Sequence, residues 1–220
     1  MSTLTQLRPT SADRPAEAPT TAVGRAMSRL SSVRVWVVVT AVYLAFAAAF
    51  FGSGAGFSIP HVQQVCGQAP PDMRFTSTAG EVHAFLEACG PAGREAYRAL
   101  QLADLLYPLV FAVFLASSLA LVLRLLAPTR RALMALTAAP FLAAVFDYLE
   151  NACAWLALVA WPEPGVADGL LGLFSTAKTV TSWVAGTLLL VALAALALSR
   201  GRALLTRHRG RDAVDDGVRP

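Results

Sequence analysis

The stretch VRVWVVVTAVYLAFAAAFF, residues 33–51, carries a single charged side chain, Arg34. A bilayer core of about 30 Å needs roughly 20 residues of helix to cross it, so this stretch predicts a membrane-spanning helix. Three further apolar runs follow at about 101–126, 132–161 and 169–198. The sequence therefore predicts an all-α fold, a four-helix transmembrane bundle that forms one membrane domain over residues 33–199.

The composition also indicates a membrane protein. Of the 220 residues, 56% are hydrophobic and only 15% are charged, and the mean hydropathy is +0.56. A soluble domain is usually about half apolar and about a quarter charged. The chain carries too little charge to cover a water-facing surface, so we interpret it as an integral membrane protein.

The positive balance does not indicate a nucleic-acid partner. The net charge is +4 and the pI is about 9.3, but the arginines lie beside the apolar runs. No stretch interleaves basic and aromatic residues as a nucleic-acid-binding surface does. We expect contacts with membrane lipids and with an apolar small molecule instead. No zinc spacing, heme spacing or Gly-rich phosphate loop occurs in the sequence, so neither a metal nor a cofactor is expected, and no oligomeric state is indicated.

The arginines also predict the orientation. They are concentrated in residues 1–32, in the connection after the second apolar run and in residues 200–220, whereas the loop 52–100 and the connection around Pro162 hold few. Because positively charged segments stay on the cytoplasmic side, we predict a multi-pass protein of the cell membrane with both termini in the cytoplasm. Residues 1–32 lack apolar periodicity and are predicted to form a disordered cytoplasmic tail. Residues 200–220 are predicted to form a basic cytoplasmic tail.

The predicted outer loop contains two cysteines, Cys66 and Cys89. This loop lies on the oxidising side of the membrane, where a pair of cysteines is expected to form a disulfide. The alternative is a thiol–disulfide exchange partner, but such proteins usually carry a C-x-x-C pair and this chain has none. We therefore expect a structural disulfide that constrains the loop.

A short amphipathic helix is predicted within the same loop. Thr78 and Glu81 have the spacing of a capping box, which marks a helix N-terminus. Gly90 and Pro91 are expected to end this helix. Its apolar face would comprise Val82, Phe85, Leu86 and Cys89. The helix is expected to lie on the outer membrane surface, either as a packing cap on the bundle or as a lid over an outward-facing cavity.

Acidic residues or a lysine lie inside three of the four predicted spans: Asp104 in the second, Asp147 and Glu150 in the third, and Lys178 in the fourth. At about 1.5 Å per residue, Glu150 and Lys178 lie roughly 16 Å and roughly 13 Å from the outer ends of their spans, so they can meet. A charge that faces lipid costs about 2.5–3.5 kcal/mol, so these side chains should point into the bundle. We predict that the four form a candidate catalytic acid/base or polar anchor cluster.

Further polar residues accompany this cluster as candidate binding residues: Asn151, Tyr107, Tyr148, Ser175 and Ser182. Asn151 is predicted to share a helix face with Asp147 and Glu150, since Glu150 and Asn151 follow Asp147 by three and four residues. The structural alternative is that Lys178 only neutralises one of the acids and fixes the register of two helices. The other polar side chains would then form hydrogen bonds between helices.

The run Phe146-Asp147-Tyr148-Leu149-Glu150-Asn151, followed by Lys178 in the last span, resembles a pattern in small uncharacterised bacterial four-span membrane proteins. Those proteins carry F-D-x-x-E-N before a final span that bears a lysine. The resemblance covers the second to fourth spans. It implies the same fold and a shared site at Asp147, Glu150, Asn151 and Lys178, and it implies no particular activity.

Three functions fit these residues. The first is an enzyme or binding protein for a lipid or other apolar small molecule that enters from the outer leaflet. The second is a non-catalytic membrane subunit or assembly factor in which the cluster is structural. The third is a proton-coupled carrier, although the inner half of every predicted span is apolar and offers no polar path across the membrane within one copy.

Overall fold

The computed structural model describes residues 29, 32–128 and 131–216, with no side-chain description for residues 131 and 205–216. Almost all of the tail predicted to be disordered, residues 1–32, lies outside the described residues. The described part of the chain is helical and contains no strand, which confirms the all-α prediction. Its elements are α2 (Val33–Gly52), α3 (Ile59–Cys66), η2 (Pro71–Met73), α4 (Ala79–Asp104), α5 (Tyr107–Leu126), η3 (Arg131–Ala138), α6 (Ala139–Ala160) and α7 (Val166–Asp216).

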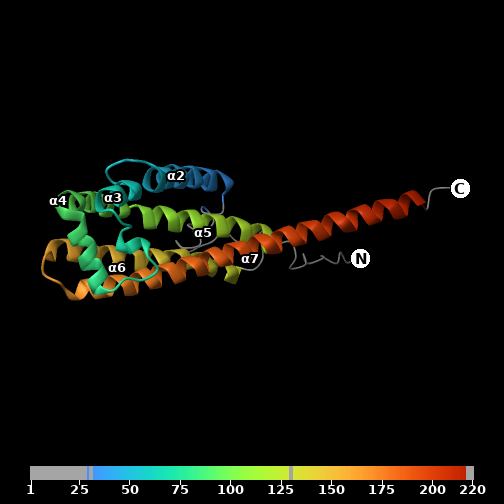
Figure 1. Ribbon diagram of the computed structural model, residues 1–220. Helices are drawn as coiled ribbons and strands as arrows, with labels where there is room; N and C mark the ends of the chain where they lie inside the picture. The colour runs from blue at the N-terminus through green and yellow to red at the C-terminus, as the bar shows by residue number, and fades with distance from the viewer. Residues whose placement is uncertain (1–28, 30–31, 129–130, 217–220) are drawn as a thin grey trace, which may run out of the picture.

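Four helical segments are long and apolar enough to cross a membrane: Val33–Gly52, Ala79–Leu126, Ala132–Ala160 and Val166–Leu204. Their helices α2, α5, α6 and α7 run side by side (Figure 1). α5 contacts each of the other three, and α6 packs extensively on α7. Trp36 Nε1 of α2 donates a hydrogen bond to Ser118 Oγ of α5 at 3.0 Å, so α2 is attached to the bundle through α5.

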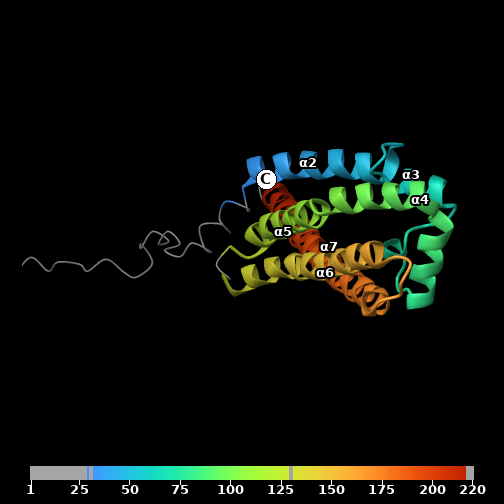
Figure 2. The same cartoon turned by 90° about the vertical axis from the view of Figure 1, so that its left-hand side faces the viewer.

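α4 bends where the sequence predicted that a helix would end. The capping box is confirmed: the Thr78 hydroxyl accepts from the Glu81 amide at 3.3 Å, and the Glu81 carboxylate accepts from the Thr78 amide at 2.7 Å. At Gly90 the backbone has φ 59°, a conformation that glycine adopts without steric cost, and the helix resumes at Pro91. The segment before Gly90 crosses the end of the bundle, and the segment after it runs along the bundle (Figure 2).

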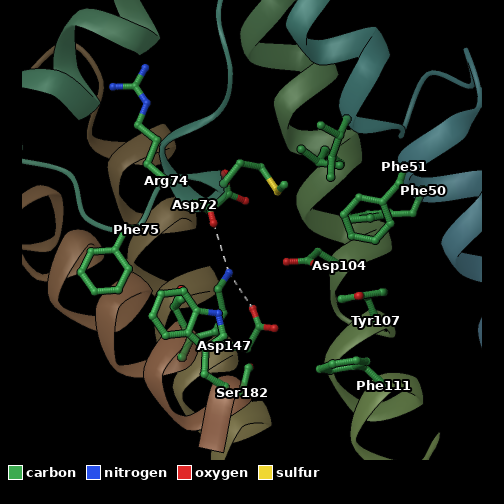
Figure 3. Close-up of a pocket in the computed structure, with 16 residues that line it drawn as sticks. Phe50, Phe51, Asp72, Arg74, Phe75, Asp104, Tyr107, Phe111, Asp147 and Ser182 are labelled. Atoms are coloured by element: carbon green, nitrogen blue, oxygen red, sulfur yellow. Dashed lines mark hydrogen bonds and ion pairs between the residues drawn. The ribbon is translucent and has the colours of Figure 1, made fainter. Parts of the chain in front are cut away.

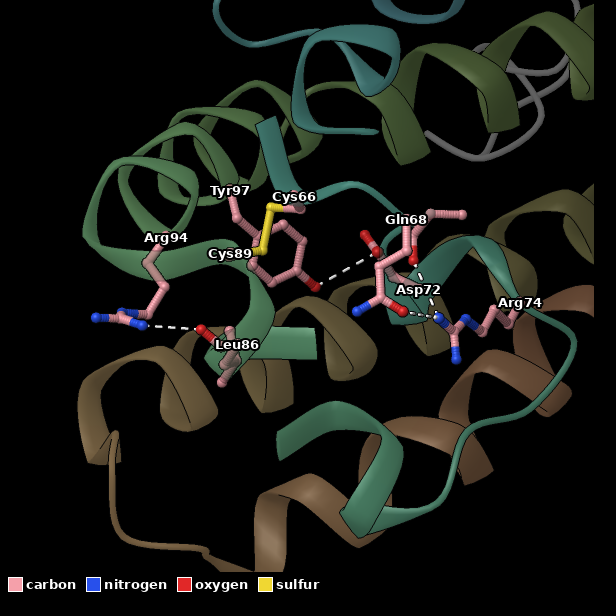
Figure 4. Close-up of a disulfide and its surroundings, with 9 residues drawn as sticks. Cys66, Gln68, Asp72, Arg74, Leu86, Cys89, Arg94 and Tyr97 are labelled. Atoms are coloured by element: carbon pink, nitrogen blue, oxygen red, sulfur yellow. Dashed lines mark hydrogen bonds between the residues drawn. A yellow bond between two sulfur atoms is a disulfide. The ribbon is translucent and has the colours of Figure 1, made fainter. Parts of the chain in front are cut away.

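The predicted disulfide between Cys66 and Cys89 is confirmed, and it joins the end of α3 to α4 beside the bend (Figure 4). A Cβ atom at Gly93 would lie 2.8 Å from the Cβ of Cys89 and 2.9 Å from the Sγ of Cys66. Glycine at this position therefore allows α4 to pack directly on the disulfide. The surrounding core contains Val62, Val82, Phe85, Leu86, Tyr97 and Leu100, all at most 2% exposed.

The segment between η2 and α4 is held against α7 by a close backbone approach. A Cβ atom at Gly172 would lie 1.9 Å from the Ser77 carbonyl oxygen, so no larger residue fits there without a shift. The Thr176 hydroxyl donates to the Phe75 carbonyl at 3.0 Å one turn further along α7. These contacts fix the position of η2 over the end of the bundle.

Two boundaries differ from the sequence prediction. The second predicted span, 101–126, begins inside α4, and the chain leaves regular helix between Asp104 and Tyr107 before α5 starts. The last helix is longer than the predicted span 169–198, because α7 continues without a break to Asp216. It projects well beyond the bundle (Figure 1), so the predicted basic tail, residues 200–220, is helical over most of its length.

Candidate functional site

Lys178 of α7 lies at the centre of the predicted cluster. Its Nζ is 3.4 Å from Asp147 Oδ1, and it forms a closer ion pair with Glu150 Oε2. The two carboxylates lie one turn apart on α6, so a single ammonium group meets both. The structure therefore brings together three of the four residues predicted to form the cluster.

Glu150 is fully buried, with none of its side chain exposed. Its Oε2 meets Lys178, and its Oε1 accepts a hydrogen bond from the hydroxyl of Ser175, also on α7. Both carboxylate oxygens are therefore occupied, and the group connects α6 to α7. A carboxylate so completely enclosed by protein fits a structural role for this part of the cluster.

Asp72, which the sequence analysis did not select, completes the coordination of Lys178. Its backbone carbonyl accepts a hydrogen bond from Lys178 Nζ at 3.2 Å. Its carboxylate accepts from Gln101 Nε2 at 2.9 Å. It also accepts from the Tyr97 hydroxyl at 3.4 Å (Figure 4). Asp72 is only 7% exposed, and burial raises the pKa of its carboxyl while the Lys178 charge and the hydrogen bonds oppose that rise.

Asp104 ends α4 and is 5% exposed. Its backbone carbonyl accepts a hydrogen bond from Asn151 Nδ2 at 3.3 Å, which places Asn151 beside it. Its carboxyl points into the open space between the helices (Figure 3). Among the described residues Asp104 takes part in no ion pair, since Lys178 is paired with Asp147 and Glu150.

A cavity of about 510 Å³ opens in front of these carboxyls. It lies between α2 and α5 on one side and α7 on the other, under the η2 segment (Figure 3). Its polar lining includes Asp72, Arg74, Asp104, Asp147, Lys178, Thr179 and Ser182. Glu150, Asn151 and Ser175 stand behind this lining and support it.

Aromatic rings form two walls of the cavity. On the α2–α5 side, the Tyr107 ring stacks on Phe50 with centroids 5.4 Å apart and on Phe111 with centroids 5.8 Å apart, and Phe51 meets its edge. On the opposite side, Phe75 stacks on Trp183 with centroids 5.8 Å apart. Figure 3 shows the aspartates between Phe75 and the α2–α5 wall. We refer to these two groups as the aromatic walls.

The candidate binding residues do not all reach the cavity. Tyr107 and Ser182 line it, whereas Ser175 and Asn151 contact the acids from behind. Tyr148 is absent from the lining: it is 37% exposed, and its hydroxyl donates to the Leu105 carbonyl at 2.9 Å. Because successive helix residues point about 100° apart, Tyr148 cannot share the face of its neighbour Asp147.

Hydrogen-bond acceptors outnumber donors around the cluster. Gln101 and Asn151 are buried and donate through their amide nitrogens, but Gln101 Oε1 and Asn151 Oδ1 have no partner among the described residues. A buried acceptor without a donor costs free energy. Neither amide lines the cavity, so these two oxygens belong to the buried support behind the cluster.

The acids are not arranged as a metal site. Among the residues that the structure describes, no group of three or more His, Cys, Asp or Glu side chains could hold a metal ion. The chemistry available is an enclosed set of carboxyls, one ammonium group that is already paired, and a large aromatic surface. No protein-family profile, curated protein or solved structure matches this chain.

Proposed function

We propose that this protein is an integral membrane protein that binds a lipid-soluble small molecule in the cavity between α2, α5 and α7. The cavity carries the proposal, because it combines buried carboxyls with aromatic walls in a volume of about 510 Å³. Sites for small molecules are usually mostly apolar hollows of about 300–1,000 Å³ with a few convergent polar groups. We further propose that the cavity lies in the outer half of the membrane, with both termini in the cytoplasm, on the distribution of arginines.

The purely structural alternative explains only part of the cluster. Lys178, Glu150 and Ser175 are sufficient to join α6 to α7 through a buried ion pair. Asp104 and Asp147 also face the cavity, although an intramembrane carboxyl that only fixed a register would not need an open space beside it. The resemblance to four-span proteins with an F-D-x-x-E-N pattern supports a shared site at the same residues.

The carrier alternative requires a polar route beyond the cavity. Toward the other end of the bundle, α5 and α7 pack through an apolar cluster of Leu119, Val122, Leu123 and Ala192. This cluster offers no group that could pass on an ion or a proton. Binding, with or without chemistry on the bound molecule, therefore has more support than transport.

The rim of the cavity provides an entry route from lipid. Trp183 is 65% exposed, Phe75 is 50% exposed and Phe51 is 41% exposed, and all three line the cavity. Large aromatic side chains that are both exposed and cavity-lining can meet the acyl chains of the bilayer. A molecule dissolved in the membrane could thus enter sideways without crossing water.

The decisive experiment fills the cavity. Ser182→Phe places a ring in the cavity, whereas Val184→Phe adds the same ring at a position that is 51% exposed and absent from the cavity lining. We expect Ser182→Phe to remove both the saturable binding of the neutral dye Nile red in lipid nanodiscs and any small molecule that co-purifies and is detected by mass spectrometry. Val184→Phe should retain both. Equal behaviour of the two variants would contradict ligand binding in this cavity.

A further inference from the structure

Lys178 has no donor left for a ligand. An ammonium group carries three N–H donors. Those of Lys178 are used by Asp147, Glu150 and the Asp72 carbonyl. The one lysine of the cluster is thus fully occupied inside the protein.

Acidic side chains outnumber basic ones around the cavity. Asp72, Asp104 and Asp147 line it and Glu150 stands directly behind, against Lys178 and Arg74. Arg74 donates to Gln68 Oε1 at 3.2 Å and to the Ala69 carbonyl at 3.3 Å, so its guanidinium is engaged with the α3–η2 segment (Figure 4). Asp104 is a buried carboxyl that points into the cavity and forms no ion pair among the described residues.

The aromatic walls supply a second, independent feature. A cation placed over a ring face is attracted by the ring quadrupole, and aromatic cages are a recurrent means of binding ammonium groups. Tyr107 lies directly beside Asp104 in the cavity, with Phe50, Phe51 and Phe111 around it (Figure 3). A carboxyl and several aromatic rings therefore lie together in one part of the cavity.

From these features we propose that the ligand is an amphipathic organic cation, a protonated or quaternary amine on an apolar body. Its cationic group lies at Asp104 between the aromatic walls, and its apolar body extends past Trp183 and Phe75 toward lipid. A cationic group would supply the ionised form of Asp104 with a counterion, which neither an anionic nor a neutral ligand would do.

This inference rests on the proposed function, and the test separates the two. Three probes share one fluorescent apolar body: diphenylhexatriene, its trimethylammonium derivative and its propionic acid derivative. Each is titrated against the full-length protein in phosphatidylcholine nanodiscs, and saturable quenching of tryptophan fluorescence reports binding near Trp183. The variants are Asp104→Asn, Asp104→Glu and Ser182→Phe. Glu163→Gln, at an exposed position outside the cavity lining, is the matched charge control.

We expect the cationic probe to bind the unmodified protein about tenfold more tightly than the neutral probe, because the neutral probe lacks the charged contact with Asp104. Asp104→Asn should abolish this preference and leave the neutral probe unaffected, whereas Asp104→Glu and Glu163→Gln should keep it. If the neutral or the anionic probe binds the unmodified protein as tightly as the cationic one, the cation proposal is wrong even if Asp104→Asn fails to fold. If Ser182→Phe also leaves every probe unaffected, the cavity does not bind ligand and the proposed function fails with it.

Discussion

The Lys178 ammonium group donates to the backbone carbonyl of Asp72 at 3.2 Å, across more than a hundred residues of sequence. A side chain of the last helix thereby holds the segment that closes one end of the cavity. The same ammonium pairs with Asp147 and Glu150, so one group stabilises both the α6–α7 contact and the position of η2. Lys178 therefore couples the stability of the bundle to the position of the segment that closes the cavity.

Replacing this lysine tests that coupling. Lys178→Met leaves the buried Glu150 without a cation, and breaking one side of a buried ion pair typically costs about 3–5 kcal/mol. We expect a loss of that order in the free energy of unfolding, measured by denaturant titration in mixed micelles. Adding Glu150→Gln to Lys178→Met should recover part of the loss, because the uncompensated charge is removed. A double variant less stable than Lys178→Met would contradict the charge argument.

Gly172→Ala tests the close approach between α7 and the segment before α4. The added Cβ would overlap the Ser77 carbonyl, so the segment must move. Overpacking of this kind typically lowers the free energy of unfolding by about 1–3 kcal/mol. Gly169→Ala is the matched control, because its Cβ has no atom within 4 Å, and alanine should stabilise the helix by about 0.5–1 kcal/mol. Thermal denaturation in detergent should therefore shift in opposite directions. Equal shifts in the denaturation temperature would show that the close contact between Gly172 and Ser77 does not determine stability.

The burial of Asp72 predicts that the stability of the protein depends on pH. Burial raises the pKa of this carboxyl above its ordinary value of 3.8, so the folded protein keeps the proton at pH values where the unfolded chain has lost it. The contribution to stability is therefore fully present below the unfolded pKa and is lost as pH rises through the folded pKa. Asp72→Asn should remove this loss of stability with rising pH, because asparagine does not titrate, while it keeps a side-chain oxygen for the Gln101 amide. The check is the difference in denaturation midpoint between the two proteins from about pH 4 to about pH 7; a difference that does not change with pH would contradict the prediction.

The disulfide predicts a large loss of stability on removal. It closes a loop with a sequence separation of 23, for which chain-entropy arguments give about 3 kcal/mol. We expect Cys66→Ser combined with Cys89→Ser to lower the free energy of unfolding by about that amount. Cys153→Ser, at the buried free cysteine, should lose less because no crosslink is removed. Reductant should destabilise the unmodified protein but not the double variant.

Much of the fold can be read from periodicity and local chemistry. The apolar runs predicted the four helices, the Thr78–Glu81 spacing predicted the start of α4, and the location of Cys66 and Cys89 predicted their bond. The spacing of Asp147 and Glu150 placed both on one face of a helix. Each of these follows from a rule that acts over a few residues or from the length of a helix.

The rest of the site depends on long-range fit. Nothing local marks Asp72, which follows two prolines in an irregular segment and is brought to Lys178 only because Gly172 allows that segment to lie on α7. The aromatic walls were missed for a different reason. Phenylalanines in an apolar span have the same pattern whether they fill a core or line a cavity, and only the packing of α2 against α5 distinguishes the two.

Beyond Lys178, α7 continues as one helix for 38 residues, to Asp216. At the usual helical rise per residue this part is about 57 Å long. An unbroken helix of this kind is a stiff rod. A tilt of a few degrees where it meets the cavity would move its far end by several ångströms. A change in the packing around Lys178 would in this way be converted into a displacement of the helix tip, far from the cavity.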